Sequence, residues 1–102
     1  MDKVLSFLGI AKKAGKVVTG TDAVCDKMAK GEIYFIFTAL DSSAATIDKM
    51  EHKAFYYQIP FNKTYTTNEL NSSIGSANIK VIGITDASFG EGFKKKINKE
   101  EM

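Results

Sequence analysis

The chain has 102 residues, of which 44% are hydrophobic and 25% are charged, and it contains eight glycines, one proline and one cysteine. This is the balance of an ordinary globular protein, and the length predicts a single domain over residues 1–102. A single cysteine excludes an internal disulfide. The N-terminal segment lacks the pattern of a signal peptide, and no stretch approaches the ~20 apolar residues of a membrane span. We therefore expect a cytoplasmic protein without membrane association.

The charge is unevenly distributed, although the net charge of +2 is too small to identify a polyanionic partner. Residues 1–31 contain six lysines and three acidic residues, for a net charge of +3. Residues 32–102 contain eight lysines and nine acidic residues, for a net charge of −1. The sequence has no arginine, so any cationic side-chain contact to nucleic acid would come from lysine, which lacks the planar fork that reads guanine.

Helical and strand patterns alternate along the chain. Apolar residues at helical spacing mark the helices, and short β-rich apolar runs mark the strands. In chain order the predicted elements are a helix over 2–14, a short strand over 16–19, a helix from 21 or 22 to 30, a strand over 33–39, a helix over 44–53, a strand over 55–59, a helix over 68–74, a strand over 80–85 and a helix after 86. This alternation favours an α/β protein, a three-layer α/β/α sandwich with a small mixed four-stranded sheet.

The start of the second helix is the most informative local feature. Thr21 or Asp22 is a suitable N-cap, because either side chain can accept hydrogen bonds from the first-turn N–H groups. Gly31 suits the end of that helix. A capping Asp22 would satisfy the helix end internally and compete with any ligand for the same N–H groups.

Several segments, in order, resemble the kink-turn-binding ribosomal-protein superfamily, and in particular its short bacterial branch of YlxQ-type proteins. The likeness covers nearly the whole chain and is carried by LGIAKKAGKVVTG, KGEIYFIFTALDSS, YYQIP, ELNSSIG and VIGITDASFGEGFKKKI. The resemblance implies an α/β/α sandwich that binds RNA without catalysis. The typical partner of that superfamily is a kink-turn, an internal bulge with sheared G·A pairs.

The contact motif of the superfamily is only partly present. In the family, a glycine, a small residue, Asn-Glu and a lysine three places on form the motif at the start of the second helix. Gly20 and Thr21 match it, whereas Asp22, Ala23 and Asp26 stand where Asn, Glu and Lys are expected. Aspartate only accepts hydrogen bonds, and a reversed charge at a phosphate contact costs on the order of a kcal/mol. We therefore expect RNA binding that is weaker or altered relative to a typical kink-turn binder.

The predicted RNA-binding surface combines a basic patch before the helix start, the helix start itself and two loops of small residues. Its members are Lys12, Lys13, Lys16, Thr19, Gly20, Thr21, Asp22, Lys27, Asp41, Ser42, Gly75, Ser76 and Asn78. We expect the lysines to crowd beside the Gly20 turn and attract phosphate, and backbone N–H groups to hold the bulge. An alternative stays open: the acidic residues cap the helix and stabilise its dipole, the lysines form a solvated helix end, and the loops are ordinary turns.

Candidate catalytic and metal-ligating residues are few. Cys25 lies in the second predicted helix and His52 in the third, and nothing in the sequence places them together. No other cysteine or histidine exists to build a zinc site. We therefore predict no catalytic residue, no metal site and no cofactor. Tyr56, Tyr57 and Phe61 could stack on bases, although alternation along a strand would bury about half of them.

Two hypotheses follow from these features. The first is a monomeric, non-catalytic RNA-binding protein, associated with the ribosome, whose partner is structured RNA such as ribosomal RNA or another kink-turn RNA. The second is a protein-interaction module that has kept the fold and lost kink-turn recognition. Ala23 and Asp26 motivate the second hypothesis, because they remove two expected RNA contacts.

Overall fold

A computed structural model describes the backbone of residues 2–101 and the side chains of residues 2–97. Its elements, in chain order, are α1 (Lys3–Lys13), β1 (Val17–Thr19), α2 (Thr21–Ala29), β2 (Phe35–Thr38), α3 (Ala44–Tyr57), β3 (Phe61–Asn62), α4 (Thr67–Ile74), β4 (Val81–Ile84) and α5 (Ala87–Glu101). The predicted order of helices and strands is confirmed. Over residues 2–101, none of the helices combines the length and the apolar character needed to cross a bilayer.

The four strands form one mixed sheet in the order β1-β4-β2-β3. Strand β4 is antiparallel to both of its neighbours, and β2 pairs with β3 in parallel. Every residue of β2 and β4 is buried, which confirms the prediction of strands covered on both faces.

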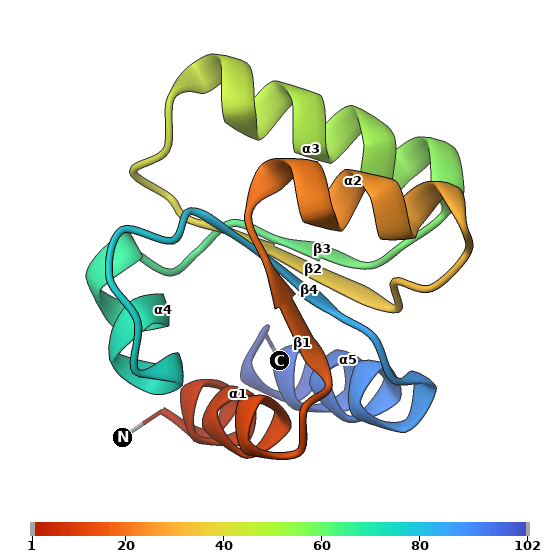
Figure 1. Ribbon diagram of the computed structural model, residues 1–102. Helices are drawn as coiled ribbons and strands as arrows, with labels where there is room; N and C mark the ends of the chain where they lie inside the picture. The colour runs from red at the N-terminus through yellow and green to blue at the C-terminus, as the bar shows by residue number, and fades with distance from the viewer. Residues whose placement is uncertain (1, 102) are drawn as a thin grey trace.

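Helices cover both faces of this sheet (Figure 1). Helices α2 and α3 lie on one face, over a core that includes Val24, Met28 and Met50. Helices α1, α4 and α5 lie on the other, over a larger core that includes Leu8 and Phe93. The structure is therefore the predicted three-layer α/β/α sandwich with a small mixed sheet.

The predicted strand over residues 55–59 is wrong, because helix α3 continues to Tyr57. Met50 and Ala54, four residues apart, are both buried, so the helical face toward the sheet extends through this segment. Gln58 then ends the helix in the left-handed conformation, with φ of 58°. The contact of this helical face with the sheet overrides the strand propensity of the aromatic residues.

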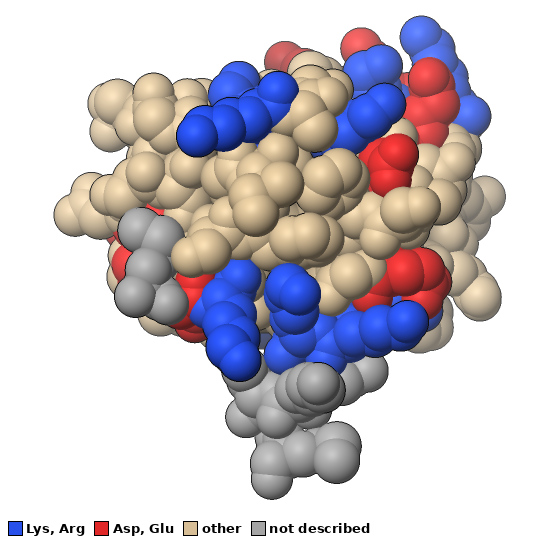
Figure 2. All heavy atoms as spheres, turned by 90° about the horizontal axis from the view of Figure 1, so that it is seen from below, with Lys and Arg blue, Asp and Glu red and all other residues tan. Residues whose placement is uncertain are grey.

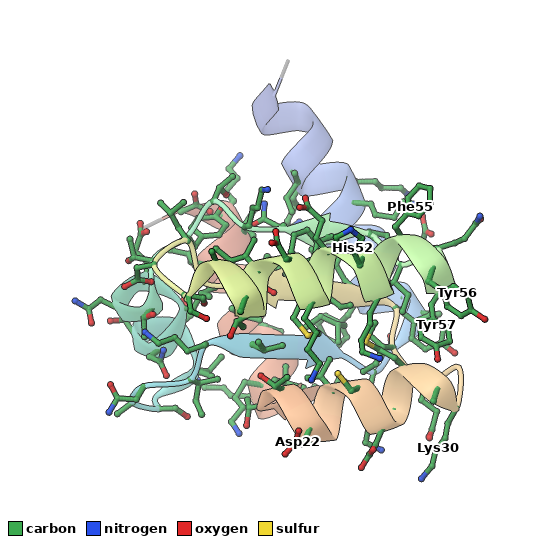
Figure 3. The ribbon with its side chains drawn as sticks, turned by 90° about the horizontal axis from the view of Figure 1, so that it is seen from above. Asp22, Lys30, His52, Phe55, Tyr56 and Tyr57 are labelled. Atoms are coloured by element: carbon green, nitrogen blue, oxygen red, sulfur yellow. The ribbon has the colours of Figure 1, made fainter. Side chains whose placement is uncertain are left out.

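The strand in this part of the chain begins after Pro60, as β3, and pairs with β2. The carbonyl oxygen of Pro60 accepts a hydrogen bond from the Ile36 N–H at 3.0 Å, so proline serves the sheet as an acceptor. Phe55 and Tyr56 are 86% and 78% exposed, and Figure 3 shows them at the end of α3 that is far from Asp22. They therefore lie away from the start of α2.

Helix α5 packs closely against the segment before β2. A Cβ atom on the buried Gly90 would lie 2.8 Å from Tyr34 Cβ and 3.1 Å from the Tyr34 carbonyl oxygen. Both of these atoms belong to the backbone or adjoin it, so neither can yield by a side-chain rotation. The glycine thus sets the distance between helix and sheet at this point.

We expect Gly90→Ala to destabilise the protein. Helix propensity alone favours alanine by about 1 kcal/mol, whereas overpacking costs about 1–3 kcal/mol, so the net loss should reach about 2 kcal/mol. Urea denaturation measures the free energy of unfolding, with Ser88→Ala, an exposed change in the same helix, as control. A Gly90→Ala protein as stable as the wild type would contradict the close contact.

Candidate nucleic-acid interface

Three segments from distant parts of the chain meet at the start of β4. The Gly20 N–H donates to the Val81 carbonyl oxygen at 2.9 Å, and the Ala39 N–H donates to the Lys80 carbonyl oxygen at 2.8 Å. The start of α2 and the loop after β2 therefore flank the start of β4. We name these segments the Gly20 turn (residues 19–22), the β2–α3 loop (residues 39–43) and the α4–β4 loop (residues 75–80).

The N-cap of α2 is Gly20, so the prediction that Thr21 or Asp22 caps this helix is wrong. Gly20 has φ of 95° and ψ of 144°, a backbone conformation open in practice only to glycine. Its N–H is still bonded to β4 while its carbonyl oxygen already accepts from the Val24 N–H at 3.0 Å. The chain thus passes from strand to helix at one residue, which places Thr21 and Asp22 inside the first helical turn.

This arrangement leaves the N-terminus of α2 open. No side chain caps it, and the N–H groups of residues 21–23 have no acceptor within the described part of the chain. The other four helices each have a side-chain cap, supplied by Asp2, Ser43, Thr66 and Asp86. A Cβ atom on Gly20 would meet nothing within 4 Å, so the space over the turn is free. Unpaired N–H groups and the positive end of a helix dipole make such a terminus suited to an anion.

The first turn of α2 carries an acidic residue and no lysine. Asp22 lies in the first turn of α2, and Asp26, exposed on the same side of the helix, lies one turn further along, next to Lys27. Lys27 lies in the last turn, and Figure 3 shows Lys30 at the opposite end of α2 from Asp22. Positive charge at the open end of α2 therefore does not come from lysines of α2.

The β2–α3 loop is held through the side chain of Asp41. Asp41 Oδ1 accepts from the Thr67 hydroxyl at 2.7 Å and from the Thr67 N–H at 2.9 Å. Lys80 Nζ donates to the same Thr67 hydroxyl at 2.9 Å. The hydroxyl of Thr67, with its N–H, lowers the pKa of the Asp41 carboxyl below its ordinary value, and the charge of Lys80 acts in the same direction. Asp41 thus ties its loop to the start of α4, and the hydroxyl oxygen of Ser42 beside it is buried without a partner among the described residues.

The α4–β4 loop is held by Asn71, whose side chain is only 5% exposed. Its Nδ2 donates to the carbonyl oxygens of Thr67 at 2.6 Å and Ile79 at 2.8 Å. Its Oδ1 accepts from the Ile79 N–H at 3.0 Å. Gly75 and Asn78, with φ of 68° and 62°, shape the exposed part of the loop between these anchors. The loop therefore presents Gly75, Ser76 and Asn78 from fixed ends.

Thr67, Asn71 and Lys80 belong to the site, but the sequence analysis does not select them. Asn71 does leave a weak signal, because it is a polar residue between Leu70 and Ile74 on the apolar side of a predicted helix. Thr67 and Lys80 leave no comparable pattern. Their role depends on Asp41, which lies 26 positions before Thr67 in the chain.

The expected crowding of the basic patch beside the Gly20 turn is wrong. The carbonyl oxygen of Lys16 accepts from the Thr85 N–H at 2.9 Å, at the end of β4 opposite Val81. Four residues of extended chain, roughly 13 Å, separate Lys16 from Gly20. Lys12 and Lys13 lie in the last turn of α1 and line a groove between α1 and α4. Seen from below, the lysines form two groups on either side of a broad uncharged area (Figure 2).

Cys25 and His52 lie in different surroundings. Cys25 Sγ is 4.0 Å from Met50 Sδ, in the core between α2, α3 and the sheet. His52 is exposed on α3, where its Nδ1 lies 2.7 Å from the carbonyl oxygen of Asp48 (Figure 3). Among the side chains of residues 2–97, no three from His, Cys, Asp or Glu gather as metal ligands.

Comparisons with known proteins agree with the predicted family. The sequence matches no family model. It is 30% identical over 95 residues to the RNA-binding protein YlxQ of Enterococcus faecium, which covers 93% of this chain and 91% of that protein. It is 33% identical over 83 residues to the RNA-binding protein YlxQ of Bacillus subtilis (strain 168), which covers 81% of this chain and 83% of that protein.

Two solved structures share the fold. A protein with unknown function from Bacillus halodurans C superposes with a TM-score of 0.92 and 30% sequence identity, over 96% of this chain and 99% of that chain. The Giardia lamblia 15.5kD RNA binding protein superposes with a TM-score of 0.81 over 95% of this chain and 83% of that chain. Its sequence identity is 13%, so this second likeness concerns the fold alone.

The lowered pKa of Asp41 predicts a pH dependence of stability. A carboxyl whose pKa is lower in the folded state stabilises the protein above its ordinary pKa, about 4, and loses that contribution as the pH falls through the folded value. We expect Asp41→Asn, which keeps an acceptor and removes the charge, to lower the Tm at pH 7. The difference from the wild type should shrink as the pH is lowered below about 4.

Thermal unfolding of both proteins over a pH series measures this difference. Asp48→Asn, a change of an exposed carboxyl on α3, provides the matched control and should follow the wild type. A deficit of Asp41→Asn that stays the same at acid and neutral pH would show that the charge contributes nothing.

Proposed function

Because the chain belongs to the family of the RNA-binding protein YlxQ, we propose that it is a non-catalytic RNA-binding protein that recognises a kink-turn or a related structured RNA in association with the ribosome. The open N-terminus of α2 behind Gly20, flanked by two anchored loops, is the observation that carries this proposal. The interface comprises the Gly20 turn, the β2–α3 loop and the α4–β4 loop.

Backbone groups supply the central contacts in this proposal. The N–H groups of residues 21–23 donate to phosphate or to base acceptors, and Gly20 lets the RNA backbone approach closely because no side chain covers the turn. Contacts of this kind do not depend on side-chain identity. They explain how an RNA site can persist although Asp22 and Ala23 replace the expected Asn and Glu.

Side-chain charge works against tight binding. The exposed carboxylates of Asp22 and Asp26 repel phosphate near the start of α2, while Lys80, held at Thr67, adds positive charge on the side of the α4–β4 loop. We expect phosphates to lie toward Lys80. The same two carboxylates favour the second candidate, a protein-interaction module on this fold, which predicts no measurable RNA affinity at physiological salt.

We expect Gly20→Ala to abolish or strongly weaken RNA binding. Alanine strains the backbone at φ of 95°, by about 1–3 kcal/mol, and places a methyl group where the RNA backbone approaches. The measurement is a titration against a fluorescently labelled kink-turn RNA at two salt concentrations, with a plain duplex as the reference RNA. The affinity of Gly20→Ala for the kink-turn should fall by roughly tenfold or more, a loss of about 1.4 kcal/mol.

Gly31→Ala is the matched control for this experiment. Gly31 also has a positive φ, 72°, and open space around its Cβ position, but it follows the other end of α2. It should lose less stability, because Gln58 and Asn78 also adopt a positive φ near this value, and it should keep RNA affinity. Equal losses of affinity in the two variants would remove the Gly20 turn from the interface. Failure of the wild type to bind either RNA would favour the interaction module.

Reversing one acidic charge should strengthen binding. Asp26→Lys restores the residue type that the superfamily motif has at this position and changes the local charge by two units. We expect roughly fivefold tighter binding at low salt and a salt dependence steeper by about one unit on the log–log plot. Glu32→Lys makes the same charge change on an exposed residue beyond the other end of α2 and should have a smaller effect. If both variants gain equally, net charge rather than position 26 is responsible.

A further inference from the structure

A groove of about 590 Å³ runs between α1 and α4, on the sheet face opposite α2 and α3. The two helices approach closely at Gly9, where a Cβ atom would lie 3.0 Å from the Ser73 carbonyl oxygen. Leu5, Ile10 and Ile74 contribute apolar surface to the groove. Lys12 and Lys13 line its other part, at the C-terminal end of α1.

The polar side chains of this groove are hydrogen-bond donors without anionic partners. Lys12 and Lys13 are exposed, and neither forms an ion pair within the described residues. Ser72 adds an exposed hydroxyl, and no acidic residue lines the groove. The carboxylates of Asp2 and Glu69 are engaged as helix caps, of α1 and α4 respectively. The charge of the groove is therefore complementary to a polyanion.

The α4–β4 loop connects this groove to the proposed interface. Gly75, the C-cap of α4, lines the groove. Lys80, at the other end of the loop, is bonded through its carbonyl oxygen to Ala39 beside the start of β4. Figure 1 shows the loop running from the end of α4 near α1 to the start of β4. An RNA that contacts the whole loop would therefore reach both places.

We propose that this groove binds the sugar–phosphate backbone of a helical stem of the same RNA whose bulge lies at the Gly20 turn; the inference rests on the proposed function. Lysine and serine donors fit the phosphates and 2′-hydroxyls that an RNA helix displays, and they need no base readout. The apolar floor fits the carbon atoms of the riboses. In this proposal Lys12 and Lys13, which lie away from the Gly20 turn, form a second contact with the RNA, and this contact positions the stem.

The experiment compares two kink-turn RNAs with the same core, one with truncated stems and one with stems extended beyond the 30 Å length of the protein. The variant is Lys12→Gln with Lys13→Gln, which removes both charges from exposed positions. Lys30→Gln with Lys95→Gln, two exposed lysines that do not line the groove, is the matched control. Circular dichroism checks that all the proteins fold.

We expect the groove variant to bind the long-stem RNA roughly tenfold more weakly, with a salt slope lower by about two units, one for each lost phosphate contact. It should bind the truncated RNA as the wild type does. Hydroxyl-radical footprinting should show that the variant loses protection of the stem and keeps protection of the bulge. The control variant should keep the affinity for both RNAs.

Three results would overturn the proposal. Equal losses for both RNAs would place these lysines at the bulge, and no loss for either RNA would leave the groove without an RNA contact. If a second copy of the chain occupied the groove, the groove variant would sediment differently as free protein and both RNA affinities would be unchanged. In all three cases wild-type binding to the kink-turn core would persist, whereas its absence would overturn the proposed function itself.

Discussion

The pairing of β4 with strands on both sides is the constraint on which the rest of this structure depends. One end of β4 holds the Gly20 turn on one side and the β2–α3 loop on the other, through backbone bonds from Gly20 and Ala39. Gly83 lies inside this arrangement, where a Cβ atom would come within 2.8 Å of the Ile33 side chain. The same strand therefore sets the spacing of the helices above it and the alignment of the loops at its end.

Helix α4 converts this alignment into a surface of defined shape. Thr67 holds Asp41 and Lys80, and Asn71 holds both backbone polar groups of Ile79. Side chains of one short helix thus fasten the β2–α3 loop at Asp41 and the α4–β4 loop at its end before β4. Fixed loops lose less conformational freedom when a ligand binds, so this network lowers the entropy cost of recognition.

In the proposed function, the open end of α2 supplies a binding geometry that does not depend on its side chains. The N–H groups of residues 21–23 belong to the backbone. They are therefore present although Asp22, Ala23 and Asp26 stand in place of the residues of the superfamily motif. What those replacements alter is the electrostatic potential around the site. The proposed partner is accordingly one whose phosphates lie near Lys80 and the α1–α4 groove instead of along α2.

The amino-acid sequence predicted the order of the elements, the two strands buried on both faces and the family. It could do so because periodicity, apolar runs and motif residues are properties of neighbouring positions. Only the tertiary structure showed that residues 55–57 belong to α3, because the decisive contacts of that helix are with the sheet. The same holds for the missing cap of α2 and for the Asp41–Thr67–Lys80 network, which joins residues far apart in the chain. The tertiary structure also decided that the lysines close to Gly20 in sequence lie away from Gly20 in space. The extended strand β1 separates these lysines from Gly20.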